Sequence, residues 1–578
     1  MHGVPREDAG FTQFPYVNPA APKGGEARFA KQGSFDSLNP LIVKGVSAEG
    51  VRQYVYESLM ARAFDEPFTL YGLIAETVET PPDRAWVEFT LNPKAKFSDR
   101  TPITVDDVIF SHAVLRDRGR PNHRSYYKKV TKVEKTGKQS VRFTFDGSGD
   151  REMPLIMGLM PVLPSHRFTP ETFETTSLEA PIGSGPYLVS EVDPGKSIAF
   201  RRDPEYWGRD LPVNRGLYNF DEVQIDYFRD ASSMFEAFKS GLIEFRDELA
   251  PTRWAQGYEF PALTKGRVVK EALPIETPAG MSALAFNTRR PFFADPKVRQ
   301  ALIRLFDYAW VDRTLYHDLF AYSESFFARS ELSSHGRPAD AVERALLAPY
   351  PNAVKPEIMD GTFSFPASDG TGQNRQGRVE ALKLLEEAGY VLKDGTLVIA
   401  ETGEPFTFEI LARTRAQERL LLTYARALKQ VGIDARIRQV DSAQYQRRKQ
   451  TFDFDMIPNY WGASLSPGNE QSFRWGTKAA KTEGSLNLPG VENDAVDAMI
   501  KAILEAKTRE GFVSAVRALD RVLLSGDYVV PLFYLPKQWV AYWKTLKRPS
   551  ETPLYGYQIN AWWHDREQEP GDETPSEH

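Results

Sequence analysis

Flat aromatic rings and hydrogen-bonding side chains are concentrated in one stretch of the chain, from Asp453 to Thr477. The stretch is predicted to begin as a buried strand, Phe452–Ile457, and to continue as a long loop. Aromatic faces beside amide, carboxylate and guanidinium groups are the surfaces that line ligand pockets, whereas an aromatic core under a surface loop is the alternative interpretation. The candidate binding residues here are Asn459, Tyr460, Trp461, Ser464, Asn469, Glu470, Arg474 and Trp475.

Sequence motifs for catalysis or metal binding are missing. The chain contains no H-E-x-x-H, G-x-S-x-G, P-loop or G-x-G-x-x-G pattern, and Gly183-Ser184-Gly185-Pro186 has the spacing of neither a phosphate loop nor a nucleophile elbow. It has no cysteine, and its eight histidines include no i, i+4 pair. We therefore expect a protein that is not an enzyme and that has no catalytic residues, metal site or cofactor. A hydrolase on an α/β scaffold stays as an alternative.

Composition and charge narrow the class of protein further. The 578 residues carry a net charge of -6, which argues against general binding of nucleic acid. The basic run Tyr445–Lys449 is accordingly interpreted as a solvated helix face. No apolar run approaches the roughly 18 residues that a membrane span needs. Met1 precedes a polar segment with no signal pattern, so either the protein is cytosolic or a signal has been removed. The absence of cysteine suits an oxidising compartment.

Strand and helix patterns alternate along the chain, which predicts an α/β fold. Asp295-Pro296 is a helix start, and Thr104 with Asp107 forms a capping box. Segments rich in Pro and Gly near 274–280 and 524–531 are candidate joints. Two joints far apart in sequence predict a lobe of about residues 279–526 that is connected to the rest of the chain by two strands.

Several stretches of the chain form a set of motifs that occur in a fixed order. They are WVEFTLNPKAKFSDRTPITVDDVIFS at 86–111, PIGSGPYLV at 181–189, DPEYWG at 203–208, LAFNTRRPFFADPKVRQAL at 284–302 and VEALKLLEEAGY at 379–390. Together they resemble one family, the extracytoplasmic dipeptide- and oligopeptide-binding proteins of ABC importers (family 5), from about residue 24 to residue 534. Two further stretches, YVNPAAPKGG at 16–25 and SPGNEQ at 466–471, look like the YejA-like branch.

The resemblance implies a two-lobed periplasmic-binding-protein (type II) fold with an extra subdomain inserted in lobe I. Ligand would bind in the cleft between the lobes, which close by a hinge motion. The implied division is lobe I at 1–50, its inserted subdomain at 51–184, lobe I again at 185–278, lobe II at 279–526, and a lobe I return strand with a C-terminal tail at 527–578.

The resemblance also implies roles for individual residues. An Arg after a lobe II strand holds a peptide carboxylate in this class, and the matching position is Arg413 or Arg415. An Asp that binds the peptide's free amino group follows the strand-end Trp in the family, and Ser464 stands in its place. Glu470 supplies the missing carboxylate, or the nitrogen of the ligand is acylated, as in a murein peptide. Phe35 and Asn39 belong to the lobe I loop expected to face these residues.

The function expected from this resemblance is capture of a peptide or peptide conjugate, with murein peptides favoured, and its delivery to an inner-membrane ABC permease. We expect a periplasmic monomer whose signal peptide is absent from this sequence. Tyr460, Trp461 and Trp475 are predicted to offer apolar platforms. The same tryptophans support an alternative, a galactoside-like oligosaccharide as the ligand. A scaffold or chaperone role is a further alternative.

Overall fold

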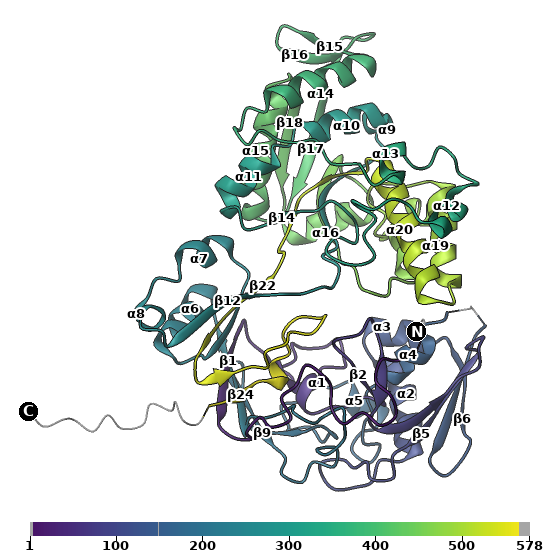
Figure 1. Cartoon of the computed structure of the whole chain (residues 1–578), viewed down its shortest axis with the longest axis vertical. Coiled ribbons are helices and arrows are strands. Elements are labelled where there is room, and N and C mark those ends of the chain that lie inside the picture. The colour runs from purple at the N-terminus through teal and green to yellow at the C-terminus, as the bar shows by residue number, and fades with distance from the viewer. Residues whose placement is uncertain (1–3, 148–149, 566–578) are drawn as a thin grey trace, which may run out of the picture. The chain divides into compact units, whose positions relative to one another are not determined.

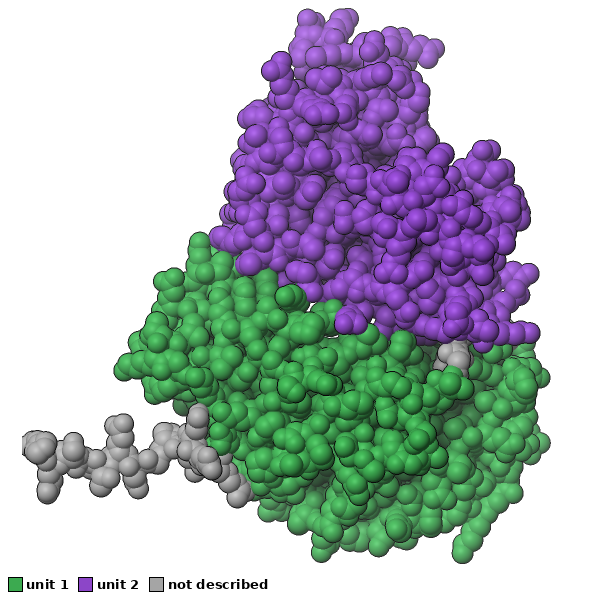
Figure 2. Space-filling model, in the orientation of Figure 1, with its two compact units in different colours: residues 1, 3–275, 537–578 green, residues 2, 276–536 purple. Residues whose placement is uncertain are grey.

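The chain passes from one structural unit to the other after Ile275 and again after Pro536 in the computed structural model, which describes residues 4–147 and 150–565 (Figure 2). Unit 2 is Glu276–Pro536, and unit 1 contains the residues on either side. Residues 527–536 therefore belong to unit 2, which corrects their predicted assignment to lobe I. The reason is β20 (Val529–Pro531), which pairs with β13 (Met281–Phe286) in the sheet of unit 2. The finer division of lobe I stays a prediction.

Unit 1 is built on three antiparallel or mixed sheets (Figure 1). In one, β1 (Glu26–Gln32) lies parallel to β10 (Glu222–Phe228), followed by β9 (Ser197–Arg202) and β8 (Tyr187–Asp193). The second has the order β4 (Ala75–Glu79), β5 (Trp86–Leu91), β7 (Ser140–Phe145) and β6 (Val130–Lys135). In the third, β22 (Gln538–Trp543) lies between β11 (Phe245–Glu248) and β12 (Val268–Leu273). Two small pairs are β2 (Met60–Arg62) with β3 (Leu70–Gly72), and β23 (Leu546–Lys547) with β24 (Trp563–His564).

The helices of unit 1 are short except for α2 (Val105–Arg118). Thr104 caps α2, and the reciprocal bonds with Asp107 that define a capping box are present, which confirms that prediction. The other helical segments are α1 (Val51–Tyr54), α3 (Pro121–Tyr127), α4 (Met153–Gly158), α5 (Pro170–Phe173), α6 (Ala231–Ser240), α7 (Pro251–Gln256), α8 (Pro261–Thr264) and the 3-10 turn η2 (Ile559–Ala561).

The family-like motifs of unit 1 meet at one buried carboxyl group, that of Glu57. It accepts hydrogen bonds from the Tyr206 hydroxyl and from the indole nitrogen of Trp207, 3.1 Å away, and both donors belong to the DPEYWG stretch. The PIGSGPYLV stretch packs beside it so closely that a Cβ on Gly183 would lie 1.9 Å from the carbonyl oxygen of Val55. These two motifs therefore help to build the core of unit 1.

Unit 2 is organised around a five-stranded sheet in the order β18 (Asp434–Gln439), β17 (Thr407–Ala412), β19 (Met456–Trp461), β13 and β20. β17, β18 and β19 are parallel, and β13 is antiparallel to both of its neighbours. Along β13, Met281, Ala283 and Ala285 enter one hydrophobic core, whereas Leu284 and Phe286 enter another. The sheet is thus buried on both faces, as α/β sheets usually are.

Helices cover both faces of this sheet. On one face lie α10 (Pro296–Arg304), α14 (Arg375–Glu387) and α15 (Arg415–Lys429), and on the other the helix pair α19 (Asp494–Glu505) and α20 (Arg509–Ser525). Asp295 caps α10, as predicted. The remaining elements are α9 (Pro291–Ala294), α11 (Tyr308–Val311), the π-helical turn η1 (Asp312–Tyr316), α12 (Ala341–Leu347), α13 (Pro356–Met359), α16 (Ser442–Gln450), α17 (Glu470–Trp475), α18 (Thr477–Ala480), and the strand pairs β14 (Ala321–Tyr322) with β21 (Phe533–Tyr534) and β15 (Tyr390–Lys393) with β16 (Thr396–Ile399). None of the helices in the described ranges has the length and apolar character needed to cross a membrane.

Candidate functional site

A pocket of about 530 Å³ opens in unit 2 beside the carboxyl ends of β17 and β19. In the described part of the chain these two strands are in register at a single pair, Ile410 opposite Met456. Beyond that pair β19 has no partner on this side, so Pro458 can occupy the strand without breaking a ladder hydrogen bond. The pocket lies where the two parallel strands separate, a usual place for ligand sites in α/β folds. Its lining residues are Ser282, Leu284, Tyr316, Phe320, Arg413, Gln417, Leu420, Leu421, Tyr445, Lys449, Pro458, Asn459, Tyr460, Leu532 and Phe533.

The charged residues that line this pocket are both cations. Arg413 follows β17 directly, and Thr414 caps α15 after it. Lys449 reaches in from α16 and donates a hydrogen bond to the side-chain oxygen of Asn459, 2.8 Å away. Burial, and next the charge of Arg413, lower the pKa of Lys449. The two positive charges repel each other, and an anion placed between them would be stabilised by both.

Unused hydrogen-bond donors strengthen that conclusion. The side-chain nitrogen of Asn459 is buried and makes no hydrogen bond, although its oxygen is held by Lys449. A buried amide without a partner costs free energy that a ligand carbonyl or carboxylate would recover. Tyr460 is 62% exposed, and its hydroxyl donates to the Ala279 carbonyl at 3.0 Å. Its ring is therefore fixed in place with a face free for a ligand.

Two predicted platforms, Trp461 and Trp475, are parts of the core instead. They are 3% and 2% exposed, and their ring centroids lie 5.1 Å apart. The indole nitrogen of Trp461 donates to the Leu486 carbonyl at 3.0 Å, and Trp475 packs edge-on against Phe326. The alternative interpretation of an aromatic core is thus correct for both tryptophans. The strand was also misplaced: β19 is Met456–Trp461 rather than 452–457, because Phe452 has a φ of 56°, which a strand does not allow.

The remaining predicted residues of this stretch lie outside the pocket, on α17 and the turn before it. The Glu470 carboxylate accepts from the Gly468 amide at 3.0 Å, and Ser464 accepts from the Ser466 amide at 3.2 Å. Arg474 donates to the Gly462 carbonyl at 2.5 Å, while the Asn469 amide nitrogen is buried without a partner. The predicted use of Glu470 as a replacement amine clamp therefore has no support in the geometry of its turn.

Three further predicted residues are placed as follows. Arg415 opens α15, but its side chain lies outside what the structure describes. Phe35 is 3% exposed and packs on Tyr227, and Asn39 uses its side chain on the Phe173 carbonyl and the Leu41 amide. Phe35 is therefore part of the core of unit 1, whereas Asn39 also lines a unit 1 pocket of about 480 Å³, and the predicted cleft between the lobes stays a prediction.

Lys449 and Tyr445 were missed because the run 445–449 was interpreted as a solvated helix face. The two residues are four apart, so they share one face of α16, and the Tyr445 hydroxyl donates to the Pro458 carbonyl at 3.0 Å. Arg447 lies on the opposite, exposed face. The i, i+4 spacing of a tyrosine and a lysine was the signal available in the sequence.

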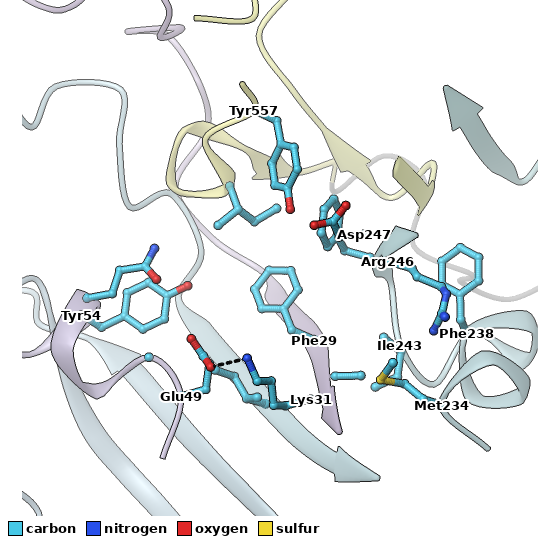
Figure 3. A pocket seen from close by; sticks show the side chains of 16 residues that line it. Phe29, Lys31, Glu49, Tyr54, Met234, Phe238, Ile243, Arg246, Asp247 and Tyr557 are labelled. Carbon is cyan, nitrogen blue, oxygen red and sulfur yellow. Dashed lines mark ion pairs between the residues drawn. The ribbon is translucent and has the colours of Figure 1, made fainter. Parts of the chain in front are cut away.

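A second pocket, of about 270 Å³, lies within unit 1 (Figure 3). Its walls come from β1, α1, β11 and a C-terminal segment that contains Tyr557. Because β1 and α1 are about 200 residues from β11 and about 500 from Tyr557, no local pattern in the sequence could have indicated this pocket. Its charged side chains include Lys31, Glu49 and Asp247.

Comparison with known proteins identifies the family. The model of the bacterial extracellular solute-binding proteins, family 5, matches residues 69–483. This chain belongs to that family and is a solute-binding protein, as the sequence motifs predicted. A Brucella melitensis protein named only as a binding protein is 51% identical over 573 residues, which are 98% of this chain and 93% of that protein.

Two relatives from Agrobacterium fabrum have more specific names. The peptidoglycan-binding protein YepA is 44% identical, over 98% of this chain and 95% of its own length. A protein named as a peptide-binding YejA is 42% identical, over 96% and 91%. The predicted resemblance to the YejA-like branch is therefore confirmed.

Among solved structures, the oligopeptide-binding protein AppA from Bacillus subtilis, in complex with a nonapeptide, shares the fold. The TM-score is 0.64 at 20% identity, and the match covers 94% of this chain and all of AppA. The predicted fold class is confirmed by this likeness.

Proposed function

We propose that this protein is the periplasmic capture component of an ABC importer for peptides or peptide conjugates, and that murein peptides are its preferred ligands. It would bind the solute and release it unaltered to an inner-membrane permease. A monomer is sufficient for this role, because each chain carries its own pocket. The relatives named for peptidoglycan and peptide binding support the ligand class.

The observation that carries the proposal is the cationic pocket of unit 2. A peptide ends in a carboxylate, and Arg413 with Lys449 offers that group two positive charges at one place. The free amide nitrogen of Asn459 can donate to the same carboxylate or to the adjoining peptide carbonyl. No acidic residue is among the described residues lining this pocket, so nothing there repels an anion.

An uncharged oligosaccharide is less well matched to this pocket. The sugar alternative relied on the ring faces of Trp461 and Trp475, and both rings are buried. Tyr460 alone of the three predicted platforms keeps an exposed ring. A neutral sugar would also leave Arg413 and Lys449 without a counter-charge.

Calorimetry tests the proposal with a matched set of ligands: murein tripeptide, anhydromuropeptide, a plain oligopeptide, the same oligopeptide with an amidated C-terminus, and mannohexaose. We expect the acids to bind and the amidated peptide to bind at least tenfold more weakly, because it lacks the anion. If mannohexaose binds and no peptide does, the proposal is wrong and the oligosaccharide alternative is correct. Binding by none of them would exclude both.

A further inference from the structure

The pocket of unit 1 combines an apolar wall with charged groups of both signs (Figure 3). Phe29 on β1 and Tyr54 on α1 form part of one side, and Ile243 and Met234 lie further along the wall. Asp247 on β11 and Tyr557 face each other above them in this view. Such a surface suits a ligand group that has an aliphatic stem and a polar end.

Most of the charges around the pocket are already balanced. Lys31 and Glu49 form an ion pair at 2.8 Å. The Nε of Arg246 bonds to Glu248 at 2.8 Å, while its Nη1 is buried without a hydrogen-bond partner. Asp247 is different, because no cation lies within ion-pair distance of it in the described part of the chain, and its side chain is exposed to the pocket. One carboxylate is thus left without a counter-charge.

The surroundings of Asp247 favour the binding of a cation. Burial of the carboxyl group and the nearby charge of Glu248 raise the pKa of Asp247, against the lowering effects of the Tyr557 hydroxyl and the Arg246 charge. Tyr557 lies beside this carboxylate in the pocket. A bound ammonium group would stabilise the ionised form and lower this pKa again.

We propose that the unit 1 pocket binds a primary ammonium group at the end of an aliphatic stem, with Asp247 as the counter-ion and Phe29, Tyr54, Ile243 and Met234 as the wall along the stem. The inference extends the proposed function, because it assigns this pocket to an amine-bearing side chain of the peptide ligand. It places amine recognition on unit 1, whereas the uncharged Ser464 and the occupied Glu470 of unit 2 do not provide it.

The test uses the full chain with methyl-labelled Met and Ile, since Met234, Ile225, Ile243 and Ile559 all line the pocket. The probes are N-acetyl-lysine methylamide and its norleucine analogue, which lacks the amine. In the wild type we expect the lysine probe to shift the pocket methyls with at least tenfold higher affinity. In Asp247→Asn this preference should vanish, while in Glu259→Gln, a control carboxylate exposed on unit 1 outside the pocket lining, it should remain. The methyl spectra also report whether each variant is folded.

Calorimetry on peptides that differ only in lysine or norleucine separates this inference from the proposed function. If peptides bind but Asp247→Asn leaves their ratio unchanged, the inference is wrong and the proposed function stands. If no peptide binds, the proposed function is wrong, and the methyl titration still decides the pocket. Equal affinity of both probes, or no methyl shift with either, overturns the inference.

Discussion

Replacement of Glu57 by Gln should change how the stability of unit 1 depends on pH. Burial raises the pKa of Glu57 from an ordinary 4.5 to about 7, against the lowering effects of the hydrogen bonds that it accepts from Tyr206 and Trp207. The folded state therefore keeps a proton on Glu57 at pH values where the unfolded chain has lost it. Its stabilising contribution is complete below about pH 4.5 and is lost as the pH rises through about 7.

The size of the change in stability follows from the shift in the pKa of Glu57. One pKa unit corresponds to about 1.4 kcal/mol, so the shift of Glu57 amounts to about 3 kcal/mol. Gln has no proton to lose, so the stability difference between wild type and Glu57→Gln should move by up to about 3 kcal/mol in favour of the variant between pH 4.5 and 8. The altered hydrogen bonds of the variant change its free energy of unfolding by the same amount at every pH. This constant does not affect how the stability difference changes between pH 4.5 and 8.

Hydrogen exchange in increasing urea, measured on peptides from unit 1, gives this free energy without a contribution from unit 2. The control is Glu76→Gln, whose side chain is exposed on β4. A stability difference that stays the same from pH 4.5 to 8 would show that Glu57 is ionised in the folded protein and would refute the reasoning.

The other predictions concern the unit 2 pocket. Arg413→Ala should weaken binding of a peptide acid about 10- to 100-fold in calorimetry, which is the range of one charge-assisted hydrogen bond. The control variant Arg436→Ala, on β18, should leave the affinity unchanged. Equal effects of the two substitutions would contradict the role of Arg413 in binding the carboxylate. Tyr460→Ala should weaken binding up to about tenfold with little loss of stability, since aromatic contacts contribute about 0.5–1.5 kcal/mol beyond burial, and unchanged affinity would remove Tyr460 from the site. Trp461→Ala should cost about 3–5 kcal/mol in urea unfolding because it empties a core position; loss of binding in a variant of unchanged stability would contradict its burial.

Local signals in the sequence predicted the elements of the fold well. The capping residues Thr104 and Asp295 act at short range, so their side chains determine where α2 and α10 begin. The limits of unit 2 were less accurate, because the pairing of β20 with β13 joins residues more than 240 positions apart. The predicted strand ended at Ile457, whereas β19 continues through Pro458 to Trp461, because the separation of β17 from β19 leaves room for the proline.

The site was predicted only in part. Arg413, which follows β17, and Asn459 and Tyr460 on β19 are the predicted residues that line the unit 2 pocket. The sequence alone could not show that Trp461 and Trp475 are core residues and Tyr460 a pocket residue, since cores and ligand pockets use the same aromatic residue types. Lys449 had a local signal, its i, i+4 spacing from Tyr445 on α16, which was interpreted as part of a solvated face. Asp247 depends on contacts between distant segments, which a single sequence does not encode in any local pattern.

Native mass spectrometry of the purified protein mixed with murein tripeptide tests the central claim most directly. The account predicts a one-to-one complex whose added mass equals that of the intact tripeptide, together with loss of this complex in Arg413→Ala. A complex that forms equally well in Arg413→Ala, a tripeptide recovered with altered mass, or no complex at all would contradict it.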